Sequence, residues 1–462
     1  MSRSDGRAFM PQYTKEFSQF IAKMDFSCLN STDIAAVCSC LKDFVAVTIA
    51  GSSGREAEIW QQYYSVMDNT LPSANILSAR FQRAGVLEAA AVNAVSGHSL
   101  DLDDVHTKSI THLAAVTIPT ALALGQKLNS SGAEIILAIV AGYEVGARIG
   151  EAINPSSYKH WHTTSVVGTF SSAAVAGKLL NLDEESFVNC MGSAGTQSAG
   201  VWAFLENGSM SKTLHVAHAN LCGIQSAYLA SLGFTGASTI LEGERGIISA
   251  VAPEYNLDRL LAPSPMRWKV NENSIKLYPC CRHLHSAIDA ALILHREEKN
   301  RIEKIVEITD YTYSTAIALT DNPRPANAYA AKFSLQYCIA APLLYGKLNK
   351  ESFSEEYLNN PTLQSLMKKI TPLCDESIDA QYCETKDKWA HRIVIRFSDG
   401  NTSEQYVDYP SGDFHHALSD SQLNEKFVSL TEKMLSTDMI SKLIANIDVL
   451  PEMNNVNDLF RF

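Results

Sequence analysis

The sequence lacks several patterns on which large protein classes depend. It contains no Cys-x-x-Cys pair, no Gly-x-Gly-x-x-Gly run and no Gly-x-Ser-x-Gly run. Zinc ribbons, thioredoxin-type redox chemistry, nucleotide binding and the common serine-hydrolase elbow are therefore unsupported. The ten cysteines are scattered, mostly inside apolar helical patterns, and we interpret them as reduced core residues.

Charge is also sparse, and its balance is negative. Only 19% of the residues are charged, and the net charge of -12 argues against a nucleic-acid partner. The amino terminus has no apolar core of the secretory type, and uncharged apolar stretches such as Leu113 to Gly125 are too short to span a bilayer. We therefore expect a non-secreted protein with no membrane partner, in the cytoplasm, with a mitochondrial location left open.

Length and periodicity predict two domains, the first of them helical. A chain of 462 residues is too long for one ordinary core. Apolar residues recur at three- and four-residue spacing through the first 260 residues, with short Gly, Ser or Asn breaks. Within Gly132 to Gly150, small residues repeat every fourth position at Ala138, Gly142, Gly146 and Gly150. We expect this face to lie close against another helix.

The pattern changes after Ala262-Pro263-Ser264-Pro265, where two prolines forbid a continued helix. A strand is predicted within Arg301 to Thr320, and a hairpin over Arg392 to Val407 that turns at Asp399-Gly400. Two helices, at about 283–299 and 328–345, are expected between these strands. Beyond Pro410 the helical pattern returns. The sequence thus predicts a mainly α protein, with a large all-helical domain built from residues 1–265 and 412–462 and a smaller α/β lid over residues 266–411.

One short segment gathers ionisable side chains that are costly to bury unless they do chemistry. Between His98 and His112 there are three aspartates, Asp101, Asp103 and Asp104, and a third histidine, His106. Taken alone, this segment fits two interpretations. One is a divalent-metal site, and the other is an acid/base and carboxylate-binding site that needs no metal.

Four further patches place ionisable or phenolic side chains in apolar surroundings. They contain His162, Lys212, Lys276 and Tyr337. Each patch taken singly has a plainer explanation, because histidines cap helices, lysines are usually solvated and a tyrosine often belongs to the core.

Taken together, these patches resemble the MmgE/PrpD family, from about residue 15 to about residue 450 and in the family's order. The matching motifs are His98-Ser-Leu-Asp101-Leu-Asp-Asp104, Gly142-Tyr-Glu-Val-Gly-Ala-Arg148, His162-Thr-Thr-Ser-Val-Val-Gly168, Lys212-Thr-Leu-His215, Gly233-Phe-Thr-Gly236, Ile275-Lys-Leu-Tyr-Pro279 and Phe333-Ser-Leu-Gln-Tyr337. The resemblance implies a helical domain with an α/β lid, a homodimer, and chemistry without a cofactor in the cleft between domains. It also makes a metal the less favoured interpretation of the aspartate segment.

The resemblance further implies which residues line the site: Asp101, His112, His162, Lys212, Lys276 and Tyr337. Lys212 and Lys276 are expected to bind substrate carboxylates, because ammonium groups neutralise them in a closed cleft. His112 or His162 is expected to move a proton, with Asp101 orienting a histidine and raising its pKa, and Tyr337 donating a hydrogen bond or a proton.

The activity implied is that of a lyase on a small di- or tricarboxylate, of the 2-methylcitrate dehydratase or cis-aconitate decarboxylase type. Dehydration, decarboxylation and epimerisation share an enolate-like intermediate beside a carboxylate, so the sequence leaves the reaction open. An isomerase of the iminodisuccinate epimerase type is the first alternative. An inactive dimeric scaffold that survives as a binding module is the second.

Overall fold

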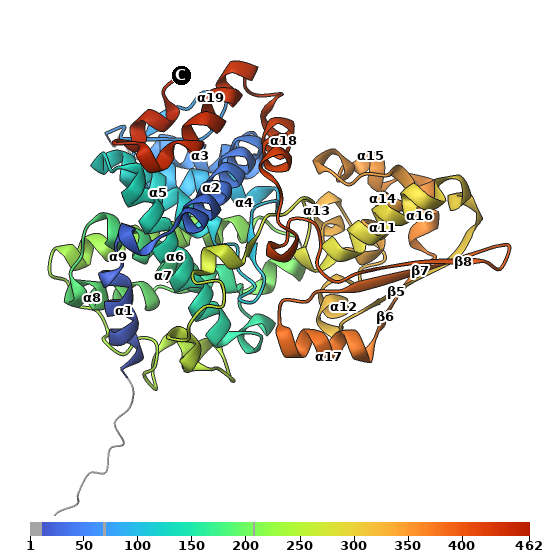
Figure 1. Cartoon of the computed structure of the whole chain (residues 1–462), viewed down its shortest axis with the longest axis horizontal. Helices are drawn as coiled ribbons and strands as arrows, with labels where there is room; N and C mark the ends of the chain where they lie inside the picture. Colours follow the sequence, from blue (N-terminus) through green and yellow to red (C-terminus); the bar gives the residue numbers. More distant parts are fainter. Residues whose placement is uncertain (1–11, 68–70, 207) are drawn as a thin grey trace, which may run out of the picture.

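The computed structural model describes residues 12–67, 71–206 and 208–462, which form two parts side by side (Figure 1). The larger part is helical and is coloured blue, green and red, and the smaller part, in yellow and orange, contains a sheet. The fold is therefore mainly α with a small sheet-containing domain, which confirms the fold class predicted from the sequence. The first eleven residues, where we expected no secretory signal, lie outside the described residues.

The larger part consists of helices from both ends of the chain. They are α1 (Tyr13–Lys23), α2 (Ser31–Gly51), α3 (Arg55–Met67), α4 (Val86–Ser99), α5 (Ala114–Leu128), α6 (Gly132–Ile153), α7 (Thr163–Leu179), α8 (Glu184–Gly195), α9 (Ser211–Ser231), α10 (Ile247–Val251), α18 (Asp420–Thr431) and α19 (Thr437–Asp448). Two short antiparallel strand pairs accompany them. These pairs are β1 (Ala74–Asn75) with β2 (Arg83–Ala84), and β3 (Val105–His106) with β4 (Asn273–Ser274).

Close packing at the centre of this part depends on small residues. Helix α7 packs against α5, α6 and α9. The predicted small-residue face of α6 meets α7 as expected, because Gly142 lies against Val175 and Gly146 lies against Ser171. Side chains at these positions would hold the helices apart. Helix α6 also begins with a capping box at Ser131 and Glu134, which fixes where it starts.

The last helices of the chain return to the larger part. Helices α18 and α19 pack on α2, and Lys42 of α2 forms an ion pair with Asp448 of α19 at 2.8 Å. One continuous apolar core joins buried residues from Phe17 to Val270 with those from Phe427 to Phe460. The two ends of the chain therefore build one helical body.

The smaller part is a four-stranded sheet with helices on both faces. Its strands are β5 (Ile305–Thr312), β6 (Ile370–Cys374), β7 (His391–Phe397) and β8 (Thr402–Val407), in the order β6-β5-β7-β8. Only the β5–β6 pair is parallel. The helices are α11 (His285–Glu298), α12 (Ser314–Thr320), α13 (Ala328–Ala331), α14 (Leu335–Tyr345), α15 (Glu355–Leu358), α16 (Pro361–Met367) and α17 (Glu376–Thr385). Figure 1 shows α11, α14 and α16 above the sheet and α12 and α17 below it.

Two details differ from the sequence prediction. The strand expected within 301–320 ends at Thr312, and α12 follows it. The single helix expected over 328–345 is broken between α13 and α14, because the Ser334 side chain caps a new helix start. Near the predicted lid boundary at residue 266, Trp268 and Val270 pack in the helical core, and the lid core begins at Tyr278.

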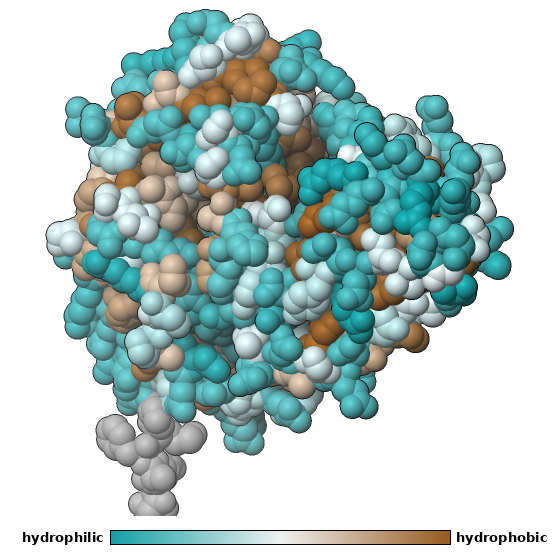
Figure 2. Space-filling view, turned by 45° about the vertical axis from the view of Figure 1, so that its right-hand side comes forward, coloured by the Kyte–Doolittle hydropathy of each residue, from teal (hydrophilic) through white to brown (hydrophobic). Residues whose placement is uncertain are grey.

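The two parts are tied together at their junction. The β3–β4 pair links the segment after α4 to the segment that leads into the lid. Lys108 reaches Glu272 at 3.3 Å and Asp387 of the lid at 3.4 Å. Figure 2 shows a largely hydrophilic surface on the smaller part, with hydrophobic residues showing along its junction with the helical body.

Helix α2 is long and apolar enough to cross a membrane by length and composition. Its most apolar window is 78% buried among neighbouring helices. This is the environment of a core helix in a folded domain, and the capping box at Asn30 and Asp33 fits the same role.

The contact at Gly142 provides a test of this packing. A Cβ atom at Gly142 would lie 2.6 Å from methyl carbons of both Thr117 and Val175. Because the core is close-packed, we expect Gly142→Val to lower the free energy of unfolding by about 2 kcal/mol or more, and Gly142→Ala to lower it by less. Chemical denaturation of the three proteins measures the order. Equal stability of Gly142→Val and wild type would contradict the packing described here.

Candidate active site

Asp101 lies at the centre of a buried charge cluster at the junction. It follows α4 in the left-handed region, with φ of 55°, a conformation that aspartate tolerates better than most residues. One carboxylate oxygen, Oδ1, accepts hydrogen bonds from the ammonium groups of Lys212 and Lys276, each at 3.0 Å. The Lys276 ammonium also donates to the backbone carbonyl of Asp101. Two lysines from distant segments are thereby held at one point.

Three histidine rings stand beside this cluster. The His98 ring lies 4.9 Å from the His112 ring and 5.9 Å from the His162 ring, between centroids. His112 directly precedes the first residues of α5, and His162 is the N-cap residue of α7. The ends of α4, α5, α7 and α9 meet here, because these helices pack on one another. Chain segments far apart in sequence thus bring the imidazoles within reach of one small molecule.

Asp103 orients two of the histidines. Its Oδ2 lies 2.7 Å from Nδ1 of His98 and 3.6 Å from Nδ1 of His112. Nδ1 of His112 is also 2.8 Å from the Asp104 carbonyl oxygen, so this nitrogen carries a hydrogen and Nε2 has the free lone pair. We expected Asp101 to orient a histidine. The hydrogen bonds place Asp103 in that position, and Asp101 faces the lysines.

Burial and neighbouring charge set the protonation of the cluster. Burial lowers the pKa of His112 to about 3, and burial also lowers the pKa of His162 well below its usual value. Burial would raise the pKa of Asp101, but the ammonium groups of Lys212 and Lys276 hold it well below its usual range. At neutral pH the imidazoles of His112 and His162 are therefore neutral and the Asp101 carboxylate is ionised beside the two lysines. This arrangement suits an anionic ligand.

A small cavity of about 30 Å³ lies between these groups and the lid. Side chains from both parts of the molecule line it: Asp101, Val105, Ile110, His112, Tyr158, His162, Trp202, Lys212, Cys281, Arg282, His283, Phe333 and Trp389. A polycarboxylate is larger than this space, so the lid has to move before such a ligand can enter.

The structure brings together five of the six residues predicted from the sequence. Asp101, His112, His162 and Lys212 line the cavity, and Lys276 is fully buried directly behind Asp101. Tyr337 is not brought to the cavity. It lies in α14 inside the lid core, and its hydroxyl donates to the backbone carbonyl of Ser352. Its ring packs against Phe353 in the lid core, with centroids 5.5 Å apart.

Lid residues that sequence reasoning did not assign also reach the cavity. The His283 ring stacks on Trp389 with centroids 3.9 Å apart, and its Nδ1 lies 2.6 Å from the Tyr313 hydroxyl. Its Nε2 is buried and, within the described residues, has no hydrogen-bond partner. In the sequence, only its position seven residues after Lys276 indicates that His283 belongs to the site. No periodic pattern distinguishes His283 from its neighbours.

Two groups of side chains have a donor set that could hold a metal ion. They are His98 with Asp103 and His112, and His106 with Glu151 and Glu272, each with ligand atoms within 4.8 Å of one another. In the first group the Nδ1 atoms of both histidines already take part in hydrogen bonds. In the second group, Lys269 forms ion pairs with Glu151 at 2.7 Å and Glu272 at 3.3 Å, so an ammonium already supplies the positive charge.

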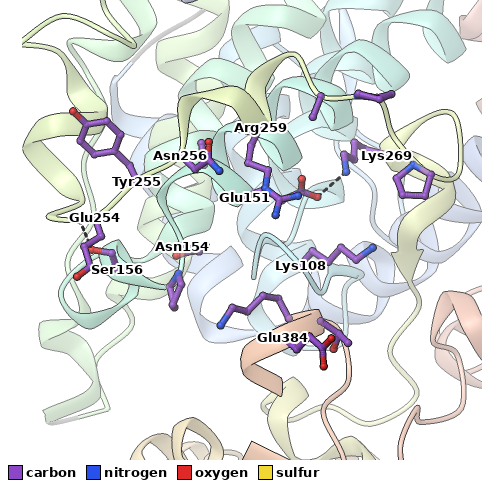
Figure 3. A pocket seen from close by; sticks show the side chains of 17 residues that line it. Lys108, Glu151, Asn154, Ser156, Glu254, Tyr255, Asn256, Arg259, Lys269 and Glu384 are labelled. Carbon is purple, nitrogen blue, oxygen red and sulfur yellow. Dashed lines mark hydrogen bonds and ion pairs between the residues drawn. The ribbon is translucent and has the colours of Figure 1, made fainter. Parts of the chain in front are cut away.

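A larger cavity of about 520 Å³ lies elsewhere at the junction (Figure 3). Lys108, Glu151, Arg259, Lys269 and Glu384 are among its lining residues. Its described lining holds ion-paired lysine and glutamate side chains but not the imidazoles that proton transfer near neutral pH needs. We therefore assign the chemistry to the smaller cavity.

The buried histidines make stability depend on pH. Burial lowers the pKa of His106, His112 and His283 to about 3, whereas the unfolded chain takes up these protons near pH 6.5. Stability is therefore lost as the pH falls below about 6.5. Burial raises the pKa of Asp104 to about 7 and also raises the pKa values of Asp43 and Glu144, and these groups act in the opposite direction. The lowered pKa values of Asp101, Asp103 and Glu272 add to the loss at low pH.

Between pH 7 and pH 5, we expect the free energy of unfolding to fall by about 2 kcal/mol less in His112→Gln than in wild type. The reason is that each buried neutral histidine contributes roughly that amount to the pH dependence, and glutamine does not titrate. Urea unfolding at the two pH values measures the difference. Equal losses in wild type and variant would show that His112 takes up its proton over the same pH range in the folded protein as in the unfolded chain.

Two domains of one known protein family match the two parts of this molecule. The MmgE/PrpD N-terminal domain matches residues 15–260, and the MmgE/PrpD C-terminal domain matches residues 278–448. The cis-aconitate decarboxylase of Homo sapiens is 28% identical, over 89% of this chain and 86% of the relative. That of Aspergillus terreus is 25% identical, over 87% and 86%. The 2-methylcitrate dehydratase of Salmonella typhi is 23% identical, over 60% of each chain. With both domains matched in order, the chain belongs to the MmgE/PrpD family.

Proposed function

We propose that this protein is a lyase that decarboxylates a small polycarboxylate of the cis-aconitate type. The observation that carries the proposal is a buried cluster of two lysines and three histidines. The cluster lies in a chain that cis-aconitate decarboxylases match over more than four-fifths of its length. The catalytic residues proposed are His112 and His162, with Lys212 and Lys276 binding carboxylates and Asp101 holding the two lysines.

Binding follows from the charge of the site. Each lysine has an ammonium with three donor hydrogens, and the two share one acceptor oxygen of Asp101. A substrate carboxylate can accept from the remaining hydrogens without displacing Asp101. Because the cluster is buried, these charge-assisted hydrogen bonds are strong and fix the orientation of the substrate.

The reaction needs one proton and no redox step. In cis-aconitate, the bond between the methylene carbon and its carboxylate breaks, and carbon dioxide leaves. The electron pair of this bond forms a new double bond to the central carbon. The electron pair of the former double bond takes up a proton at the former vinyl carbon. An imidazolium at His112 or His162 supplies this proton. The imidazole is left neutral, as it is in the empty site, and it takes up a proton from solvent again when the next substrate binds.

The proton has to arrive together with the substrate. Both histidines are neutral in the empty site, because burial lowers their pKa values. A bound polycarboxylate places several negative charges beside the rings and so raises the same pKa values. Substrate binding and histidine protonation are therefore coupled, and the acid appears only when there is a substrate to protonate.

A dehydratase is the second candidate. The same residues can remove a proton beside a carboxylate and protonate a leaving hydroxyl group, and 2-methylcitrate dehydratases are among the relatives, although they match only about 60% of the chain. An epimerase or an inactive binding scaffold remains an outcome of the test below.

We expect cis-aconitate to disappear with release of one equivalent of carbon dioxide, and 2-methylcitrate to react much more slowly. Proton NMR of each substrate with the protein, with and without a metal chelator, measures both.

His112→Ala and His162→Ala should each lower kcat at least about 100-fold, because general acid catalysis contributes about that factor, while the melting temperature changes little. Turnover of 2-methylcitrate alone would establish the dehydratase. Inversion of iminodisuccinate would establish the epimerase, activity lost with chelator would establish a metal, and silence with all three substrates would support the scaffold.

The coupling of protonation to binding makes a separate prediction. We expect the wild-type protein to take up protons when it binds tricarballylate, a tricarboxylate with no double bond to react. Calorimetry at pH 7 in two buffers of different ionisation enthalpy measures the number of protons, and His112→Gln should lower it. Binding without proton uptake would contradict a proton donor formed on substrate binding.

A further inference from the structure

A third lysine stands at the same cluster without an assigned role. Lys332 lies in the short break between α13 and α14, where the sequence predicted a continuous helix. Its ammonium crosses to the helical part and donates to the backbone carbonyl of Leu100 at 2.9 Å. Its own carbonyl accepts from the backbone N–H of Cys281 at 2.9 Å, and Cys281 lines the cavity. Lys332 is thus hydrogen-bonded to one residue that lines the cavity and precedes another, Phe333, in the chain.

The next residue fixes the position of this segment. Phe333 lines the cavity, and the Lys212 ammonium lies over its ring, 5.7 Å from the centroid. The lid segment Lys332–Phe333 is therefore placed between Leu100 and Lys212, beside the Asp101 cluster. The Lys332 ammonium is close enough to Asp101, Lys212 and Lys276 for their charges to affect its pKa.

Positive charge exceeds negative charge at this point. Lys212 and Lys276 share one carboxylate, whereas the hydrogen-bond partner of Lys332 among the described residues is a neutral carbonyl. The neighbouring Arg282 is already paired with Asp413 at 2.8 Å, and Asp103 is bonded to His98. A half-buried ammonium with a single neutral acceptor has donor hydrogens left for an anion.

The protonation of Lys332 agrees with this picture. Burial lowers its pKa to about 8, with Asp101 opposing the shift and Lys212 and Lys276 adding to it. The lysine is still mostly charged at pH 7, and a bound carboxylate favours the charged form further.

We propose that Lys332 binds a third substrate carboxylate and so makes the site selective for tricarboxylates over dicarboxylates. The inference rests on the proposed function only in that the site binds polycarboxylates, and it is independent of which reaction follows. With one ammonium for each carboxylate, Lys212, Lys276 and Lys332 hold a tricarboxylate at three points. When a dicarboxylate is bound, the Lys332 ammonium keeps its hydrogen bond to the Leu100 carbonyl.

The test compares two ligands that differ in one carboxylate and cannot react. Tricarballylate and glutarate have the same three-carbon chain, and only tricarballylate has a carboxylate on the central carbon. We expect wild type to bind tricarballylate at least about tenfold more tightly than glutarate in calorimetry. Lys332→Met should reduce this preference to less than about threefold by weakening tricarballylate alone, and Lys332→Arg should retain most of it, because arginine keeps the charge.

Lys127→Met is the matched control, since this lysine is exposed near the end of α5 and its change removes the same charge far from the cavity. It should leave the preference unchanged. If Lys332→Met weakens both ligands equally and lowers the melting temperature, Lys332 only ties the lid to Leu100 and the inference is overturned. An unchanged preference, or no binding of tricarballylate to wild type, overturns it too.

The two proposals fail separately. A protein that binds tricarballylate through Lys332 but does not turn over cis-aconitate would contradict the proposed reaction alone. A protein that decarboxylates cis-aconitate with a KM unaffected by Lys332→Met would contradict the third carboxylate contact alone.

Discussion

The ion pairs of Asp101 with Lys212 and Lys276 are the interaction on which the rest of the site depends. Lys212 is 111 residues away in sequence, at the start of α9, and Lys276 is 175 residues away, where the chain enters the lid. A buried charge that loses its partner costs about 3–5 kcal/mol, so the three groups stay together only when the helical body and the lid are both correctly placed. The same pairing holds the Lys212 ammonium at the cavity and the Lys276 ammonium behind Asp101.

Helix packing brings the histidines to this charge. Because α6 presents glycines to α7, α7 sits deep in the body and its N-cap residue His162 comes beside His98. Asp104 holds the next segment, accepting from the backbone N–H of Ala114 at 3.0 Å and from the Asn273 side chain at 2.7 Å. This places His112 at the cavity. The chemistry of the site thus depends on small residues and a buried carboxylate that contact no ligand themselves.

The sequence predicted the parts of this account that depend on local pattern or on the family resemblance. Helical periodicity predicted the helical body, and the turn residues Asp399-Gly400 predicted the β7–β8 hairpin. The resemblance selected the five residues that meet at the junction. The roles of Asp101 and Asp103 were harder to separate, because a positive φ at Asp101 turns neighbouring side chains toward different partners and leaves no sequence signal. Tyr337 was assigned by motif alone, and its contacts with the lid core, which a motif does not reveal, keep it from the cavity. His283 reaches the cavity, and Lys332 reaches the neighbouring Leu100 carbonyl, only through the tertiary fold.

The central claim is that the cavity at Asp101, and not the larger cavity around Arg259, receives the carboxylates of the substrate. The most direct measurement is a crystal structure of the protein with tricarballylate bound. The account predicts carboxylates in contact with Lys212 and Lys276, beside the rings of His112 and His162, with the lid closed over them. Tricarballylate seated among Lys108, Arg259 and Lys269, with the cavity at Asp101 unoccupied, would contradict it.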